Sequence, residues 1–134
     1  MRSTFLRGVL AEALGDAGEV AQGRIRIDAA LADAEANREG WCLPELLRIK
    51  GALLLQDGAI GAGEEYLMRA LELARAHKAL SWELRAAIAL ARLRRDQHRP
   101  QEARAFLGAV YERFSEGFAT ADLRRAKSLL DALA

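Results

Sequence analysis

The chain has one glycine-rich run, residues 58–63, with the sequence Gly-Ala-Ile-Gly-Ala-Gly. A run of this kind can cradle a phosphate, but such a loop continues into Lys-Ser or Lys-Thr, and a dinucleotide-binding loop follows a strand. Here Glu64 and Glu65 come next, and no strand-forming segment precedes the run. We therefore interpret Gly58 as the residue that ends a helix and Gly63 as a position where two helices pack closely.

Histidine and cysteine, which most often bind metals or act as nucleophiles, are scarce. The chain has one cysteine, Cys42, and two histidines, His77 and His98, which lie 21 positions apart without further ligands at metal-binding spacing. A reactive Cys42 thiolate is one interpretation, and a small half-buried residue is the more usual one. The carboxylates of Glu64 and Glu65 point to different sides of a helix, which is more typical of a solvated face than of an acid–base pair. We expect no catalytic residue, no metal and no cofactor.

Arginines and tryptophans form two further patterns. Residues 92–104 contain five arginines and two acidic residues. Such a segment is usually a solvated helix face, but it can also contact an acidic partner, a neighbouring domain or nucleic acid. Trp41 and Trp82, 41 positions apart, could stack on bases, although aromatic residues at repeat spacing more often form the core between repeats. Because 20 basic residues face 19 acidic ones, the chain lacks the overall positive charge of a nucleic-acid-binding domain.

Composition predicts an all-α fold in a single domain spanning residues 1–134. Alanine and leucine supply 50 of the 134 residues, whereas valine, isoleucine and threonine together supply 10. Alanine and leucine favour helices, and β-branched residues favour strands. No apolar stretch approaches the ~20 residues that cross a bilayer, and the first residues lack a secretory signal. We therefore expect a cytoplasmic protein with no membrane partner.

A register of 40 residues organises the chain. Four positions align in three copies: Ala11 with Gly51 and Ala91, Gly23 with Gly63 and Ala103, Ile27 with Leu67 and Leu107, and Ala30 with Ala70 and Val110. A fifth position is a turn residue, Gly18 and Gly58 in the first two copies and His98 in the third. This order of small, turn and apolar residues predicts two antiparallel helices per copy, which approach closely through the small residues.

We expect helices at about 3–16, 19–38, 43–57, 60–78, 81–97, 100–115 and 121–133. The residues expected at helix ends are first-turn prolines (Pro44, Pro100), N-caps (Ser81, Thr120) and glycines after the last turn (Gly40, Gly117). The helices would form three repeats, at about 3–38, 43–78 and 81–115, followed by a capping helix at about 121–133. The capping helix would cover the last repeat with a stripe formed by Leu123, Ala126, Leu130 and Leu133.

The spacing of small, turn and apolar residues resembles the tetratricopeptide repeat, here with longer helices than the 34-residue form. Segments 44–55, 66–75, 81–97 and 110–123 more specifically resemble the C-terminal repeats of large bacterial signalling ATPases. Those proteins place an adenylate cyclase or winged-helix DNA-binding domain first and the ATPase domain next. The resemblance implies a helix-pair solenoid that forms the C-terminal part of a larger protein. His98 replaces the glycine usual at its turn, which predicts a distorted third turn.

In tetratricopeptide repeats the first helices of successive repeats line a concave face. The resemblance maps this face to Glu12 in the first repeat, to Glu45, Arg48, Ala52 and Leu55 in the second, and to Arg85, Ile88, Arg92 and Arg95 in the third. Arginines on adjacent helices would converge on a carboxylate, for which the forked guanidinium is suited. The alternative is that these arginines only pair with acidic residues of the chain itself, such as Glu45.

These expectations favour a non-enzymatic protein–protein interaction or regulatory module in bacterial signal transduction. The concave face would bind a peptide, an acidic partner or an upstream ATPase domain, with Glu45, Arg48, Leu55, Arg85, Arg92 and Arg95 as the contact residues. A structural brace or self-association domain of a larger ATPase or cyclase, with no separate ligand, is the alternative hypothesis. In that case the chain would form homo-oligomers or support the neighbouring domain.

Overall fold

The computed structural model describes residues 2–118 and 120–134, with side chains from Thr4 onward in those ranges. The described residues form seven α-helices, one short 3-10 helix and no strand, so the predicted all-α class is confirmed. The elements are α1 (Arg2–Asp16), α2 (Val20–Ala36), η1 (Gly40–Cys42), α3 (Leu43–Gln56), α4 (Ile60–Ala76), α5 (Leu80–Asp96), α6 (Pro100–Tyr111) and α7 (Ala121–Leu133). In the part of the chain that is described, every helix is too short or too polar to span a membrane.

The first five α-helices all end in the same turn. A residue with positive φ, between 54° and 88°, follows each of them at intervals of 20 residues: Gly18, Arg38, Gly58, Lys78 and His98. At the last turn, the His98 N–H donates to the Arg95 carbonyl (2.9 Å) and the Arg99 N–H to the Arg94 carbonyl (2.8 Å), which is the Schellman pattern. The predicted distortion of the third turn is therefore wrong, because His98 adopts the same left-handed conformation as Gly58.

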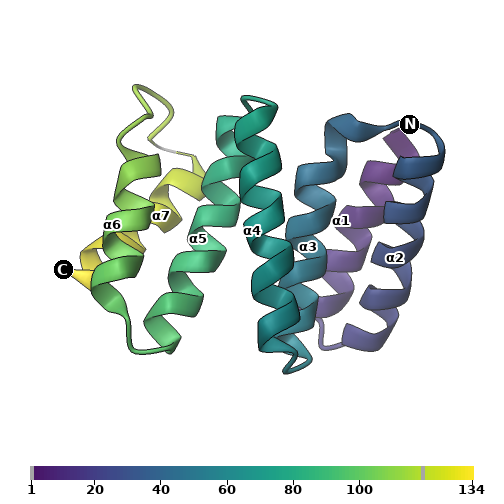
Figure 1. The fold of residues 1–134 in the computed structure, drawn as a ribbon, viewed down its shortest axis with the longest axis horizontal. Helices are drawn as coiled ribbons and strands as arrows, with labels where there is room; N and C mark the ends of the chain where they lie inside the picture. The colour runs from purple at the N-terminus through teal and green to yellow at the C-terminus, as the bar shows by residue number, and fades with distance from the viewer. Residues whose placement is uncertain (1, 119) are drawn as a thin grey trace.

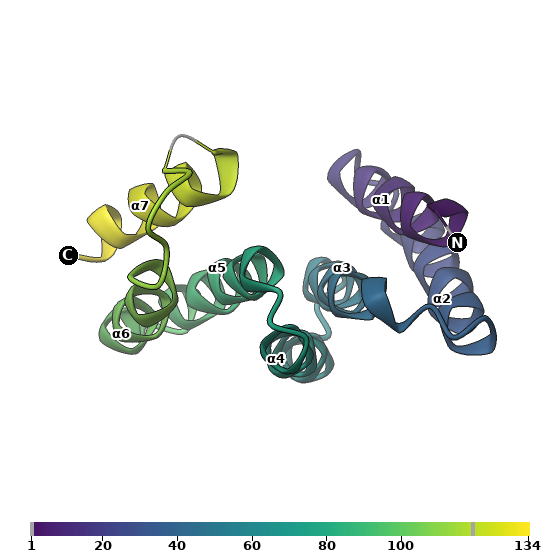
Figure 2. The same ribbon diagram turned by 90° about the horizontal axis from the view of Figure 1, so that it is seen from above.

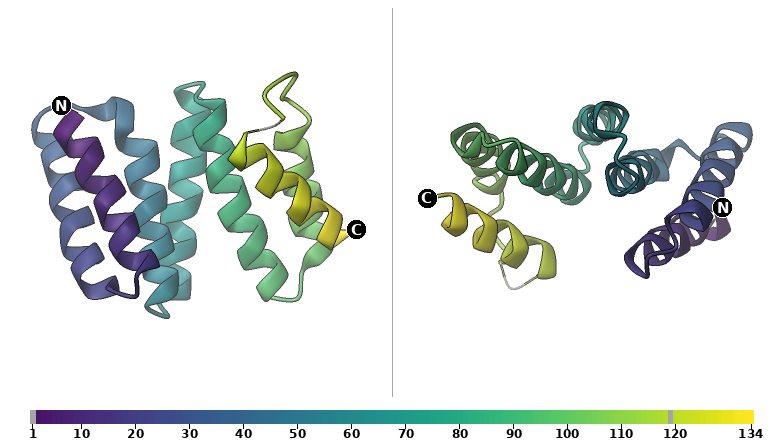
Figure 3. Two further views of the ribbon diagram at one scale, coloured as in Figure 1. Left: turned by 180° about the vertical axis from the view of Figure 1, so that it is seen from behind. Right: turned by 90° about the horizontal axis from the view of Figure 1, so that it is seen from below.

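The helices follow an open arc. Successive helices run antiparallel (Figure 1), and seen from above α2, α4 and α6 lie on the outer side whereas α1, α3, α5 and α7 lie on the inner side (Figure 2). On the inner side α1 contacts α3, α3 contacts α5, and α5 contacts α7. Seen from behind, α1 and α7 stand in front of the helices between them (Figure 3). The inner side, called the concave face below, therefore has α3 and α5 as its floor and α1 and α7 as its walls.

The aligned positions of the 40-residue register are all buried. They are Ala11, Gly23, Ile27, Ala30, Gly51, Gly63, Leu67, Ala70, Ala91, Ala103, Leu107 and Val110. Gly51 and Gly63 approach each other closely, because a Cβ built on either glycine would lie 3.0 Å from the carbonyl oxygen of the other. The predicted close contact of α3 with α4 is therefore confirmed, and small residues are required where these two backbones meet.

Several expected helix ends are confirmed and others are not. Pro44 and Pro100 lie in the first turns of α3 and α6, and the Thr120 hydroxyl accepts from the Leu123 N–H (3.4 Å) as an N-cap of α7. Ser81 is not an N-cap, because α5 already begins at Leu80 after Ala79. The two remaining expected end residues lie away from the helix ends. Gly40 begins η1, and Gly117, with φ of 77°, lies in the loop between α6 and α7.

Helix α7 covers the inner sides of α5 and α6. Leu123, Ala126 and Leu129 are buried there, while Leu130 and Leu133 are partly buried against the same core. The predicted stripe included Leu130 and Leu133, which are only partly buried, and left out Leu129, which is buried. The apolar band is wider than the expected single row, because α7 packs into the angle between two helices rather than against one.

Candidate functional site

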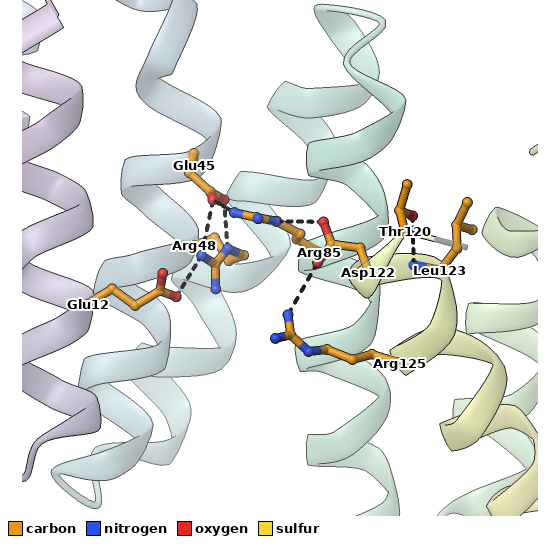
Figure 4. A network of polar contacts seen from close by, with 8 residues as sticks. All are labelled: Glu12, Glu45, Arg48, Arg85, Thr120, Asp122, Leu123 and Arg125. Atoms are coloured by element: carbon orange, nitrogen blue, oxygen red, sulfur yellow. Dashed lines mark hydrogen bonds and ion pairs between the residues drawn. The ribbon is translucent and has the colours of Figure 1, made fainter. Parts of the chain in front are cut away.

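Charged side chains from all four inner helices meet on the concave face (Figure 4). Three of them are acidic and three are arginines, and acidic and basic groups alternate from α1 to α7. We call them the groove network: Glu12 of α1, Glu45 and Arg48 of α3, Arg85 of α5, and Asp122 and Arg125 of α7. Because the 40-residue register places Glu45, Arg85 and Arg125 at equivalent positions, successive inner helices present them side by side.

Glu45 is the centre of the groove network, and its side chain is only 2% exposed. The Nε of Arg48 donates to its Oε1 (2.6 Å), and the Nη2 of Arg48 donates to its Oε2 (3.1 Å). The Nη1 of Arg85 donates to the same Oε2 from the next inner helix. The Nη2 of Arg48 also reaches Glu12 Oε2 at 2.7 Å. One buried carboxylate therefore joins α3 to α5, and its arginine joins α3 to α1.

The network continues from α5 to α7. The Nε of Arg85 donates to Asp122 Oδ2 at 2.9 Å, and the Nη1 of Arg125 donates to Asp122 Oδ1 at 3.4 Å. Asp122 lies in the first turn of α7, where a carboxylate also interacts favourably with the positive end of the helix dipole. The wall formed by α7 is therefore attached to the floor of the concave face by an ion pair as well as by its apolar side chains.

Burial and pairing together determine the charge state of the two floor arginines. Burial disfavours the charged guanidinium of Arg48, but its hydrogen bonds to Glu45 and the charges of Glu45 and Glu12 outweigh that effect and raise its pKa. The pKa of Arg85 is raised in the same way, with burial opposed by Asp122 and Glu45. Both side chains therefore remain charged, and their hydrogen bonds go to acidic residues of this chain. Internal pairing is thus observed for Arg48 and Arg85.

The remaining expected contact residues lie in different surroundings. Arg92 is exposed and lies beside the groove network on α5. Arg95 is exposed and pairs with its neighbour Asp96, Nε to Oδ1 at 3.2 Å. Leu55 points toward α4 rather than into the concave face, because its Cδ2 would lie 2.7 Å from a Cβ built on Gly63. The structure therefore brings Glu45, Arg48 and Arg85 together, with Arg92 beside them, and leaves Leu55 apart.

A small hollow of about 120 Å³ opens where the four inner helices meet. Ile88 and Ala89 form its apolar part, and Arg92 lines it together with five members of the groove network. The mapped positions Glu12 and Ile88 belong to this hollow, as expected. Asp122 and Arg125 do too, although α7 was expected to act only as a cap. Extending the 40-residue register by one further copy would have placed residue 125 on the same face as Arg85.

Cys42 and the two tryptophans contribute to packing rather than to a reactive or binding site. Cys42 is fully buried rather than half-buried, and burial followed by the charge of Glu39 raises the pKa of its thiol, which disfavours a reactive thiolate. Trp41 and Trp82 stack with ring centroids 6.3 Å apart, and Phe5 of α1 lies 5.5 Å from Trp41. These contacts join α1, η1 and α5, so the aromatic residues hold successive repeats together.

The arginine-rich segment divides between paired and unpaired side chains. Arg94 reaches Glu64 of α4 at 2.9 Å, and Arg99 pairs with Glu102. Arg92 and Arg104 have no acidic partner among the described residues. Nor do the described residues contain a group of three or more His, Cys, Asp or Glu side chains that could hold a metal ion.

No family model, curated protein or solved structure matches the chain. Its likeness to the tetratricopeptide repeat therefore rests on the spacing of its own residues, and a function has to be inferred from the groove network and its surroundings.

Proposed function

We propose that the chain is a non-enzymatic protein–protein interaction module whose concave face binds a peptide or a partner domain. In this proposal its three helix pairs and α7 form a tetratricopeptide-like solenoid, and the module serves as the regulatory C-terminal part of a bacterial signalling ATPase or cyclase. The resemblance of segments 44–55, 66–75, 81–97 and 110–123 to such proteins supports this context. A peptide or an upstream ATPase domain is the proposed partner.

The observation that supports this proposal best is the preformed concave face. Four inner helices surround a hollow that is lined by six charged side chains and by Ile88 and Ala89. The groove network holds these helices together before any ligand arrives, so binding would require little ordering of the protein. A small, mainly charged hollow with an apolar part fits an extended segment that inserts one polar side chain between the arms of the arc.

The test is to block the hollow without touching the groove network. Ala89→Gln places a larger side chain in the hollow, and Ala62→Gln makes the same change at an exposed position of the outer helix α4. Peptides selected from a displayed random library on the unaltered chain would be titrated against both variants. We expect Ala89→Gln to weaken binding at least about tenfold, and Ala62→Gln to bind as the unaltered chain does. Melting curves control for folding, because overpacking at the half-buried Ala89 can cost about 1–3 kcal/mol.

Two results would contradict peptide binding on the concave face. One is a selection that enriches no peptide at all. The other is a set of peptides that bind Ala89→Gln and Ala62→Gln equally well.

Self-association is a second candidate function, favoured by apolar side chains on the first helix pair. Leu6 and Leu10 of α1 are 58% and 54% exposed, and Ile25 of α2 is 67% exposed. Sedimentation velocity over a range of concentrations tests it. A self-association domain should show a dimer that dissociates in Leu6→Gln combined with Leu10→Gln, whereas a monomer at every concentration would contradict this second candidate.

A further inference from the structure

A second hollow lies between α5 and α7, next to the groove network. It is an open depression of about 490 Å³, lined by Arg92 and Arg95 of α5 and by Arg124 and Arg125 of α7. Ser128 also lines it, and its other lining residues are alanines and a leucine. Among the described residues no acidic side chain lines this space, which we call the arginine hollow.

Half of the positive charge in the arginine hollow is uncompensated. Arg95 pairs with Asp96 at 3.2 Å, and Arg125 reaches Asp122 at 3.4 Å. Within the described part of the chain, neither Arg92 nor Arg124 has an acidic partner. The hollow therefore presents two unpaired guanidinium groups beside two that each pair with one aspartate.

The charges that surround Arg92 are also mainly positive. Burial lowers its pKa, and the nearby positive charges of Arg95 and Arg125 lower it further. The first turn of α7 also borders the hollow, through Ala121, and adds the positive end of a helix dipole. An anion in this space would relieve the repulsion among the arginines, whereas water only screens it.

We propose that the arginine hollow binds a phosphate monoester. A phosphate monoester has a charge of about −1.5 to −2 at neutral pH, which matches the two uncompensated arginines, whereas a carboxylate would neutralise only one. The guanidinium fork can donate two parallel hydrogen bonds to phosphate oxygens, and the Ser128 hydroxyl offers a further donor. This site goes beyond the proposed function, because a free phosphate ester could occupy it whether or not a peptide lies in the groove.

The test compares two matched double variants of the chain. Arg92→Gln with Arg124→Gln removes the free charges of the hollow. Arg26→Gln with Arg104→Gln removes two arginines elsewhere that have no acidic partner among the described residues. All four positions are exposed, so both variants should fold, and melting curves check this. Calorimetric titration with inorganic phosphate and O-phosphoserine at constant ionic strength should give saturable one-to-one binding. We expect affinity to fall about tenfold or more in the first variant, as for the loss of one or more charge-assisted hydrogen bonds, and to remain unchanged in the second.

Further probes distinguish the source of the phosphate. A phosphoserine pentapeptide that binds more tightly than O-phosphoserine would indicate a phosphorylated protein segment, and equal affinity would indicate a small phosphate ester. The proposal is overturned by acetate binding as tightly as phosphate, by equal losses in both double variants, or by the absence of saturable binding. It is also overturned if an oligouridine octamer binds more tightly than every phosphate monoester, because the hollow would then recognise a nucleic-acid backbone.

Discussion

Glu45 is a buried charge whose partners come from two helices. Its carboxylate accepts from Arg48 on its own helix and from Arg85 on the next inner helix. Taking a carboxylate out of water costs several kcal/mol, and only well-placed partners offset that cost. The stability contributed by the groove network therefore depends on Glu45, because its loss removes a partner that Arg48 and Arg85 share and leaves each of them with one carboxylate.

The change Glu45→Gln keeps the shape of the side chain and removes its charge. We expect it to lower the free energy of unfolding by about 3 kcal/mol, because Arg48 and Arg85 lose their shared partner. The matched control is Glu102→Gln, which breaks the exposed i,i+3 pair with Arg99 and should cost less than about 1 kcal/mol. Urea unfolding followed by circular dichroism measures both. Equal losses in the two variants would mean that the network contributes no more than a surface pair.

Cys42 should make the stability of the folded chain fall with rising pH in the alkaline range. Its pKa is raised by burial and by the charge of Glu39, so the folded chain keeps the thiol proton at a pH where the unfolded chain loses it. Stability should therefore fall as the pH rises above the unfolded thiol pKa of about 8.5. Melting temperatures between pH 7 and 10 should show this decline, and Cys42→Ala should reduce it. The same pH dependence in Cys42→Ala would show that other groups cause it.

At the scale of elements, the repeated turn determines where each of the first five α-helices ends. Five turns contain a residue in the same left-handed conformation, but only two of these residues, Gly18 and Gly58, are glycines. A side chain in this conformation costs about 1–2 kcal/mol relative to glycine. The chain therefore accepts a small loss of stability at Arg38, Lys78 and His98.

Two glycines three positions apart should respond in opposite ways to alanine. Gly58 has a φ of 84°, so Gly58→Ala should lower stability by about 1 kcal/mol through the backbone alone, because no atom lies within 4 Å of the added Cβ. Gly61 lies in the first turn of α4 with equally open space, so Gly61→Ala should raise stability by up to about 1 kcal/mol. Thermal unfolding of both variants tests the turn assignment. A stabilising Gly58→Ala would contradict it.

At the scale of the whole molecule, α7 closes the arc by packing against the last helix pair. It buries Leu123, Ala126 and Leu129 there and attaches Asp122 to Arg85. Without α7 the inner faces of α5 and α6 would be exposed to water, as at the uncapped end of any repeat array.

Truncation after Glu116 should therefore affect the whole chain. Burial of a leucine side chain contributes about 1.5–3 kcal/mol, and α7 contributes two buried leucines. We expect the truncated chain to melt well below the full chain or to aggregate, as measured by circular dichroism and light scattering. The double variant Lys127→Gln with Asp131→Asn, which breaks only an exposed pair on α7, is the control and should melt as the full chain does. Unchanged melting and solubility in the truncated chain would mean that α7 is not needed to close the arc.

The sequence by itself determined the local structure of this protein. Helix propensity, prolines and capping residues act within one or two turns of a helix, so they predicted seven helices and the N-cap at Thr120. The 40-residue spacing added the close approach of paired helices at small residues such as Gly51 and Gly63. They missed the same turn at Arg38 and Lys78 and expected a distorted one at His98, because a left-handed conformation at these residue types is uncommon and follows from the geometry of the helix pair.

Only the tertiary structure decided which charges are paired. Arg48, Arg85 and Arg92 look alike in the sequence, but Arg48 and Arg85 meet acidic residues 36 to 40 positions away on other helices, whereas Arg92 meets further arginines in the arginine hollow. Ion pairing depends on distances of a few ångströms between side chains of different helices. Such distances are set by how the helices stack along the arc, and in particular by the return of α7 onto α5, which brings Asp122 to Arg85 and Arg124 and Arg125 to Arg92.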